Sequence, residues 1–208
     1  MLQAPGAGSA IGLRLILASA SPRRRELLAQ AGYSFTVDVA DVDESLRVGE
    51  EASAYVERLA VEKAQAVFAR QIGQDLGLAP LIVLGADTSV VLDEEILGKP
   101  ADAADARRML QRLSGKTHRV LTGIAAVTRA GVFGAVESTE VVFAEISARE
   151  LDVYCATAEP LDKAGAYGIQ GYAARWIPRI NGCYFNVMGL PIASVVRLID
   201  EACRVEGA

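Results

Sequence analysis

The chain has 208 residues, of which 51% are hydrophobic and 23% charged, enough for a buried core in one domain or two closely joined lobes. Its formal net charge of −5 argues against broad nucleic-acid binding, because proteins that bind phosphate backbones are usually basic over a whole face. No apolar run reaches the length of a membrane span, and the 3 widely spaced cysteines suggest neither a disulfide framework nor a zinc site. We therefore expect a cytoplasmic protein without nucleic-acid or membrane partners.

The start of the chain predicts a tail, a strand and a helix. Residues 1–12 are rich in Gly and Ala, which favours a flexible N-terminal tail. The apolar run Leu15–Ala18 is typical of a strand, and Ser19–Arg25 follows it with the sequence Ser-Ala-Ser-Pro-Arg-Arg-Arg. Ser21 is a suitable N-cap and Pro22 suits the first helical position, so a helix should begin at Pro22 and end near Gly32.

Three arginines then fall in the first turn of this helix, where the macrodipole is positive. Each is disfavoured there by about 0.3–1 kcal/mol unless an anion is bound. A bound phosphate reverses the argument, so the pattern predicts an anion site at Arg23 and Arg24. The alternative is a solvated basic turn on the surface.

A long helix is predicted from Glu51 to Gln71, after an acidic loop at residues 41–44. Its apolar face includes Val56 and Leu59, and Lys63 falls inside that stripe. A lysine in this position must either extend to water or meet an anion.

The apolar run Leu81–Leu84 predicts a buried strand that ends at Gly85-Ala86-Asp87-Thr88. Ligands of open α/β sheets bind at such strand ends, where Asp87 could hold a divalent cation or take a proton from water. The alternative is a turn aspartate that bonds its own backbone. A hairpin of residues 89–92 and 96–97 then leads to Lys99, which Gly98 and Pro100 present from a stiff turn.

The remaining elements alternate between helix and strand. We expect a helix over residues 102–113, strands over 117–128 and 132–143, a helix opened by the Ser147/Glu150 capping box, a glycine loop, and a C-terminal helix after Pro191. This order predicts an α/β fold with a mixed sheet. The single histidine, His118, is expected at the surface or at a strand edge.

The charged residues at these positions suit metal-assisted attack on a polyphosphate. Positive charge comes from Arg23, Arg24, Lys63 and Lys99. Carboxylates come from Asp43, Glu44 and Asp87. In the glycine loop, Gln170 can donate and accept at once, which suits the N3–H and carbonyl edge of uracil or thymine. A purely structural turn is the alternative for this loop.

Several motifs in order resemble the Maf family of nucleoside triphosphate pyrophosphatases, and the resemblance extends from Leu15 to about Leu198. The motifs are Ser19–Arg24, Gly85–Thr88, Gly98–Pro100, Leu113–Gly115, Asp162–Gly171, Ile180–Gly182 and Asn186–Pro191. The resemblance implies hydrolysis between the α and β phosphates, with a divalent metal such as magnesium or manganese. It also implies an elongated fold like that of inosine triphosphate pyrophosphatases, with a cleft between two lobes, so that residues 13–208 form one catalytic domain. A homodimer is left open.

The resemblance also implies roles for individual residues. Asp87 matches the proton acceptor, with Lys63 and Lys99 as further catalytic residues and Asp87 and Glu44 as metal ligands. The positions that match substrate-binding residues are Ser19, Arg23, Arg24, Thr88 and Gln170. Arg23, Thr88 and Gln170 match those linked to substrate choice. The loop Tyr-Gly-Ile-Gln-Gly resembles the branch that prefers dTTP and UTP, whereas the branch acting on 7-methylguanosine triphosphate has a different sequence there.

Two other functions compete with this one. The first is a nucleotide-binding regulator of cell division or septum formation in which turnover is secondary, although intact Asp87, Lys63 and Lys99 favour turnover. The second is a sugar-phosphate phosphatase, which the single acid in Gly85–Thr88 disfavours because the Asp-x-Asp motif of such enzymes is missing.

Overall fold

The computed structural model describes residues 13–73 and 80–206, and the predicted tail over 1–12 lies outside them. They form a mixed sheet in the order β2-β1-β3-β5-β6-β7, with β4 paired to β3. The strands are β1 (Arg14–Leu17), β2 (Thr36–Val37), β3 (Leu81–Leu92), β4 (Glu95–Leu97), β5 (Thr117–Val127), β6 (Val132–Val142) and β7 (Arg179–Asn181). β1 pairs in parallel with β2 and β3, and the other pairings are antiparallel. The predicted α/β class with a mixed sheet is confirmed.

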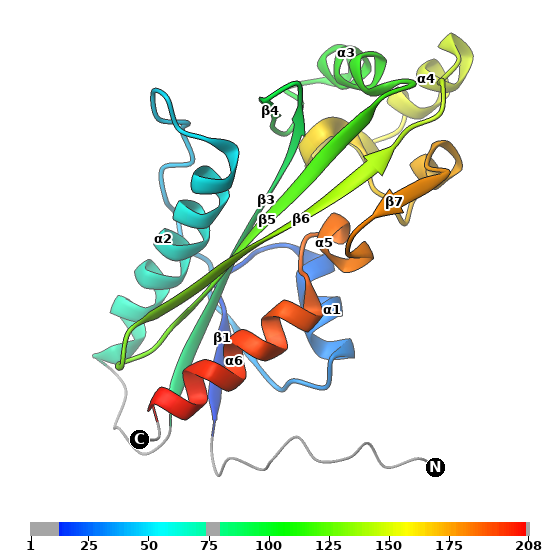
Figure 1. Ribbon diagram of the computed structural model, residues 1–208. Helices are drawn as coiled ribbons and strands as arrows, with labels where there is room; N and C mark the ends of the chain where they lie inside the picture. The colour runs from blue at the N-terminus through cyan, green and yellow to red at the C-terminus, as the bar shows by residue number, and fades with distance from the viewer. Residues whose placement is uncertain (1–12, 74–79, 207–208) are drawn as a thin grey trace, which may run out of the picture.

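Helices cover both faces of this sheet (Figure 1). They are α1 (Pro22–Gln30), α2 (Ala52–Ile72), α3 (Ala103–Leu113), α4 (Ala148–Cys155), α5 (Tyr184–Met188) and α6 (Ile192–Glu206). Figure 1 shows α2 on one face, α1, α5 and α6 on the other, and α3 and α4 at one end of the long strands. Among the described helices, none has the length and hydropathy needed to cross a membrane.

Alternation along β3 divides the core between these layers. Val83 packs with α2 in one apolar cluster, whereas Ile82 and Leu84 pack with α1 and α6 in another. Because successive strand residues point to opposite faces, Asp87 lies on the α2 face and Thr88 on the opposite face. Two neighbouring residues thus bring different chemistry to the two sides of one strand.

The prediction that the strand ends at Asp87 is wrong. β3 continues to Leu92, because Val90, Val91 and Leu92 are as deeply buried as the residues before Asp87. One edge of β3 pairs with β5 from Val83 to Val91 without a break. The other edge pairs with β1 as far as Leu84 and with β4 only from Val90 onward. Residues 85–89 therefore border a gap between β1 and β4.

Two glycines let α2 approach the sheet beside this gap. A Cβ atom at Gly85 would overlap the carbonyl oxygen of Ala60, and one at Gly123 would overlap that of Val56. Both strand positions must therefore lack a side chain for the backbone of α2 to lie this close. This close approach brings Lys63 of α2 within hydrogen-bonding distance of Asp87 of β3.

The helix caps read from the sequence are confirmed. The Ser21 side chain accepts from the backbone of Arg24 at the start of α1, and Asp102 caps α3. Ser147 and Glu150 form the complete capping box of α4. The predicted hairpin after β3 and the antiparallel pair β5–β6 are also present.

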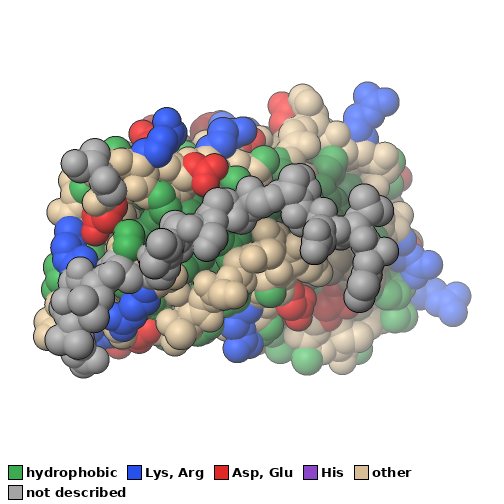
Figure 2. All heavy atoms as spheres, turned by 90° about the horizontal axis from the view of Figure 1, so that it is seen from below, with side chains coloured by type: hydrophobic (Ala, Val, Ile, Leu, Met, Phe, Trp, Pro, Cys, Tyr) green, Lys and Arg blue, Asp and Glu red, His purple; other side chains and the backbone are tan. Residues whose placement is uncertain are grey.

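Charges of both signs are interspersed over the face of the molecule that Figure 2 shows. Elsewhere, exposed pairs join neighbouring strands and helices, such as Arg112 with Glu95 at 2.6 Å and Arg119 with Glu94 at 2.7 Å. Exposed pairs of this kind contribute little to stability. They show that positive and negative side chains are mixed over the surface, so a site with an excess of one charge stands out.

Candidate active site

A cavity of about 490 Å³ opens at the gap beside β3, and segments from Ala18 to Gly189 line it. Nine of the residues predicted for the site line this one cavity: Ser19, Arg23, Arg24, Glu44, Lys63, Asp87, Thr88, Lys99 and Gln170. Asp43, the other acid predicted from the acidic loop, is not among the lining residues, and its Oδ1 accepts from Ser45 N at 2.9 Å. Five basic and three acidic side chains are among the described lining residues, in a chain whose formal net charge is −5. The cavity thus concentrates positive charge, as an anion site requires.

Lys63 lies at the centre of the charged group on the α2 face. Its Nζ is 2.7 Å from Asp87 Oδ1 and 2.6 Å from Glu44 Oε1. The side chains of Lys63 and Asp87 are each 12% exposed, while Glu44 is 54% exposed. The sequence predicts that a lysine in this apolar stripe either extends to water or contacts an anion. The structure shows the second case, because Lys63 pairs with two carboxylates.

The same contacts set the ionisation of Glu44. Partial burial pushes the pKa of its carboxyl up, but the hydrogen bond and charge of Lys63, helped by the charges of Lys99 and Arg24, lower the pKa overall. Glu44 therefore stays ionised at neutral pH and adds a second negative charge next to Asp87.

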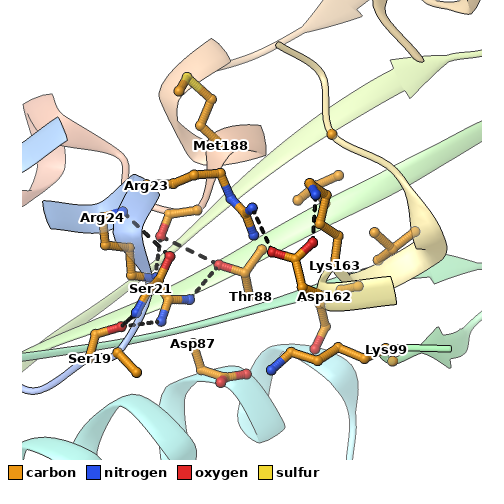
Figure 3. Close-up of a pocket in the computed structure, with 18 of the residues that line it drawn as sticks. Ser19, Ser21, Arg23, Arg24, Asp87, Thr88, Lys99, Asp162, Lys163 and Met188 are labelled. Atoms are coloured by element: carbon orange, nitrogen blue, oxygen red, sulfur yellow. Dashed lines mark hydrogen bonds and ion pairs between the residues drawn. The ribbon is translucent and has the colours of Figure 1, made fainter. Parts of the chain in front are cut away.

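Lys99 enters the cavity from the turn after β4. Figure 3 shows its side chain extending toward Asp87. The residue is exposed, and in the part of the chain that the structure describes it takes part in no ion pair within 4.0 Å. Its ammonium group is therefore available to a bound anion.

Arg24 is held by the protein itself. Its guanidinium donates to Gly189 O at 2.8 Å, Ser19 Oγ at 3.1 Å, Ala86 O at 2.8 Å and Thr88 Oγ1 at 3.0 Å. Burial lowers its pKa and the charge of Asp87 opposes that shift, but an arginine stays protonated at neutral pH. Arg24 thus supplies a fixed positive charge and ties α1 to β3 and to the end of α5.

Arg23 points to the opposite rim, where it meets an acid that the sequence did not indicate as a site residue. Its Nη1 is 3.2 Å from Asp162 Oδ2, and Asp162 Oδ1 is 2.5 Å from Lys163 Nζ. Lys163 also donates to Glu159 O at 2.6 Å. The adjacent acid and base at the start of the glycine loop were the signal for this pairing, but only the fold brings Arg23 to them.

Gln170 lies at the exposed end of the glycine loop and borders the cavity. Within the described residues, no hydrogen bond within 3.5 Å holds its amide. The amide can therefore present either its oxygen or its nitrogen to a ligand.

The family model described as Maf-like protein matches residues 14–202. This chain belongs to the Maf family.

Several relatives of this chain share one activity name. The chain is 50% identical over 189 residues to a protein of Hahella chejuensis named dTTP/UTP pyrophosphatase, covering 90% of this chain and 92% of that one. Proteins of the same name from Symbiobacterium thermophilum and Vibrio cholerae are 51% and 47% identical, each over 188 residues, covering 90% of this chain and 93% and 97% of the relatives.

The carboxylates of this Maf-family site suit a divalent cation that is held jointly by the protein and by the phosphates of a bound nucleotide. Within the described residues, no three His, Cys, Asp or Glu side chains form a group that could hold a metal. Asp87 and Glu44 nevertheless converge on Lys63 Nζ from two sides. Magnesium is commonly held by one or two carboxylates together with substrate phosphates, and this pair fits that arrangement.

The expectation that His118 lies at the surface or a strand edge is wrong. Its side chain is 2% exposed on β5, where Nε2 lies 2.7 Å from the Tyr167 hydroxyl and the ring packs edge-on against Phe143. Burial lowers its pKa to about 4, so the ring stays neutral at pH 7. His118 supports the glycine loop from behind through Tyr167, which lines the cavity.

Proposed function

We propose that this Maf-family protein hydrolyses dTTP and UTP to the nucleoside monophosphate and pyrophosphate. The observation that carries the proposal is the convergence of Lys63, Asp87 and Glu44 at one point of a cavity rich in basic side chains. The printed activity of the relatives, at about half identity over nearly all of both chains, supports the same reaction.

In this proposal Asp87 takes a proton from the attacking water as the α–β phosphoanhydride breaks. Lys63 orients the Asp87 carboxylate, and Lys63 and Lys99 stabilise the negative charge that develops on the phosphates. Arg24, held against the β3 backbone, contributes a fixed positive charge, and Arg23 contributes one from the rim of the cavity. Ser19 holds Arg24 through its hydroxyl, close to where the phosphates would lie.

Asp87 and Glu44 would hold a magnesium or manganese ion together with phosphate oxygens. Such an ion would neutralise part of the negative charge on the phosphates.

We also propose that residues 13–208 act as one two-lobed catalytic domain in the cytoplasm. The cavity draws its lining from segments between Ala18 and Gly189, so the site needs nearly the whole of this range. The absence of a nucleic-acid or membrane partner stays a prediction, and so does the oligomeric state.

A panel of nucleoside triphosphates with magnesium or manganese tests the function. We expect monophosphate and pyrophosphate from dTTP and UTP, at rates at least about tenfold above those for CTP. Release of nucleoside diphosphate and phosphate, or equal rates on every triphosphate, would contradict the proposed reaction or its specificity. Tight binding without turnover would instead favour the regulator.

A further inference from the structure

A chain of hydrogen bonds runs from the cavity into the protein beneath Thr88. Arg24 Nη2 donates to Thr88 Oγ1 at 3.0 Å, Thr88 Oγ1 lies 2.9 Å from Thr122 Oγ1, and Thr122 Oγ1 donates to the backbone oxygen of Asn186 at 3.1 Å. The chain passes from β3 to β5 and then to α5, and Thr122 and Asn186 are fully buried. Figure 3 shows the Arg24 guanidinium directed at Thr88.

The two ends of this chain fix the direction of its middle bond. A guanidinium can only donate and a carbonyl oxygen can only accept. Thr122 has one hydroxyl proton and gives it to Asn186 O, so it must accept the proton of Thr88. The competing acceptor for Thr88 is Gly189 O, but it is 3.5 Å away and already accepts from Arg24 Nε at 2.8 Å.

The accepting carbonyl is itself held rigidly. The Asn186 side chain donates to Val120 O and to Thr139 Oγ1, both at 2.9 Å. Thr139 Oγ1 in turn donates to Cys183 O at 3.1 Å, just before α5 begins. These bonds hold Asn186 in place, so its backbone oxygen remains the acceptor for the Thr122 hydroxyl.

The hydrogen-bonding role of the Thr88 hydroxyl is therefore fixed before any ligand binds. Its proton is committed to Thr122 and one lone pair to Arg24, which leaves one lone pair on a side chain that lines the cavity. Toward a ligand, the hydroxyl can accept but not donate. Gln170 differs, because its amide is free to present either polarity.

We propose that Thr122 is a positioning residue for substrate choice: it holds the Thr88 hydroxyl as an acceptor, which favours a pyrimidine whose edge carries an N–H donor. Thymine and uracil have a proton on N3, whereas N3 of cytosine has none and would face an acceptor with an acceptor. This inference rests on the proposed function. It assigns the fixed part of the specificity to Thr88 and Thr122, with Gln170 adapting to the ligand.

The test compares the binding of UTP and CTP analogues with a methylene group between the α and β phosphates, which are not hydrolysed. The variants are Thr122→Val, which removes the hydroxyl at nearly constant volume, and Thr122→Ser, which keeps it. Thr128→Val is the matched control, because Thr128 is also buried and, among the residues that the structure describes, its hydroxyl bonds within the turn between β5 and β6. Thermal unfolding of each variant establishes that it is folded.

We expect the unmodified protein to prefer the UTP analogue. Thr122→Val should lower the ratio of the CTP-analogue Kd to the UTP-analogue Kd by about fivefold, the effect of one hydrogen bond. The reason is that the Thr88 hydroxyl can then also donate. Thr122→Ser and Thr128→Val should keep the original ratio. If Thr122→Val does not fold, Thr88→Val provides the second test and should lower the ratio as much, since it removes the acceptor itself.

An unchanged ratio in folded Thr122→Val, or an equal change in Thr128→Val, would overturn the inference. A missing preference for the UTP analogue in the unmodified protein would also overturn it. The proposed function fails on a different observation, namely that the unmodified protein releases no pyrophosphate from dTTP or UTP. Because the analogues report binding alone, the two failures are distinguishable.

Discussion

Lys63 Nζ lies 2.7 Å from Asp87 Oδ1, and this contact joins the middle of α2 to the middle of β3. It forms because Gly85 and Gly123 let the helix backbone approach the sheet more closely than any side chain would permit. The catalytic pair that we propose is therefore a product of packing. It depends on two glycines that take no part in the chemistry.

Replacing Lys63 with methionine separates its charge from its packing. Methionine fits the apolar stripe of α2, so Lys63→Met should fold. Turnover of dTTP should fall by about a hundredfold or more, because the carboxylate loses its orientation and the phosphates lose a cation. Steady-state rates and urea unfolding of the same preparation measure both effects.

The control for this change is Lys116→Met, at an exposed lysine whose Nζ is 3.5 Å from Asp93. It should leave turnover unchanged. A stable Lys63→Met protein with normal activity would remove Lys63 from the mechanism.

Adding a methyl group at Gly85 should push α2 away from the sheet. The new Cβ would overlap Ala60 O, and the overpacking should lower the free energy of unfolding by about 1–3 kcal/mol. Activity should fall in the folded fraction as well, because Lys63 moves with the helix. Urea unfolding at 25 °C gives the stability of Gly85→Ala.

Gly134→Ala on β6 is the matched control, since its added Cβ would have no neighbour closer than 3.5 Å. It should change stability much less. Equal effects of the two substitutions would show that the close approach of α2 has no special role.

Buried His118 predicts a loss of stability in mild acid. Burial lowers its pKa to about 4, whereas the unfolded chain takes up a proton near its ordinary value of 6.5. Between these values the unfolded state binds more protons, so stability falls as the pH drops from about 6.5 toward 4. Between pH 7 and pH 5 this one group should cost about 2 kcal/mol.

His118→Gln isolates this contribution, because its amide can replace the bond from Nε2 to Tyr167 and does not titrate. Urea unfolding at both pH values should show the unmodified protein losing about 2 kcal/mol more than the variant. Equal losses would mean that His118 is protonated in the folded protein at pH 5.

Local signals in the sequence suffice for the helices that Ser21, Asp102 and Ser147 cap, because each cap is set by residues within one turn. The residues of the site were also found, but partly through resemblance. Their convergence depends on the gap between β1 and β4, which follows from strand pairing over long distances. No local pattern reports such pairing.

Two errors have the same origin. The polar pair Asp87-Thr88 within an apolar run predicts a strand end, although the residues beyond it are also buried. The sequence favours a surface or strand-edge position for His118, because its partner, Tyr167, is 49 residues away and no local pattern indicates it. In the same way, the chain from Thr88 through Thr122 to Asn186 joins three elements that only the fold brings together.

The central claim is that Asp87 is the group that accepts a proton during hydrolysis of the α–β bond, and Asp87→Asn tests it most directly. The amide keeps the shape of the side chain but cannot take the proton, so release of pyrophosphate from dTTP should fall at least about a hundredfold. Binding of the UTP analogue should persist. Asp93→Asn, at the exposed turn between β3 and β4, should behave like the unmodified protein. A folded Asp87→Asn protein that releases pyrophosphate at a nearly normal rate would contradict the account.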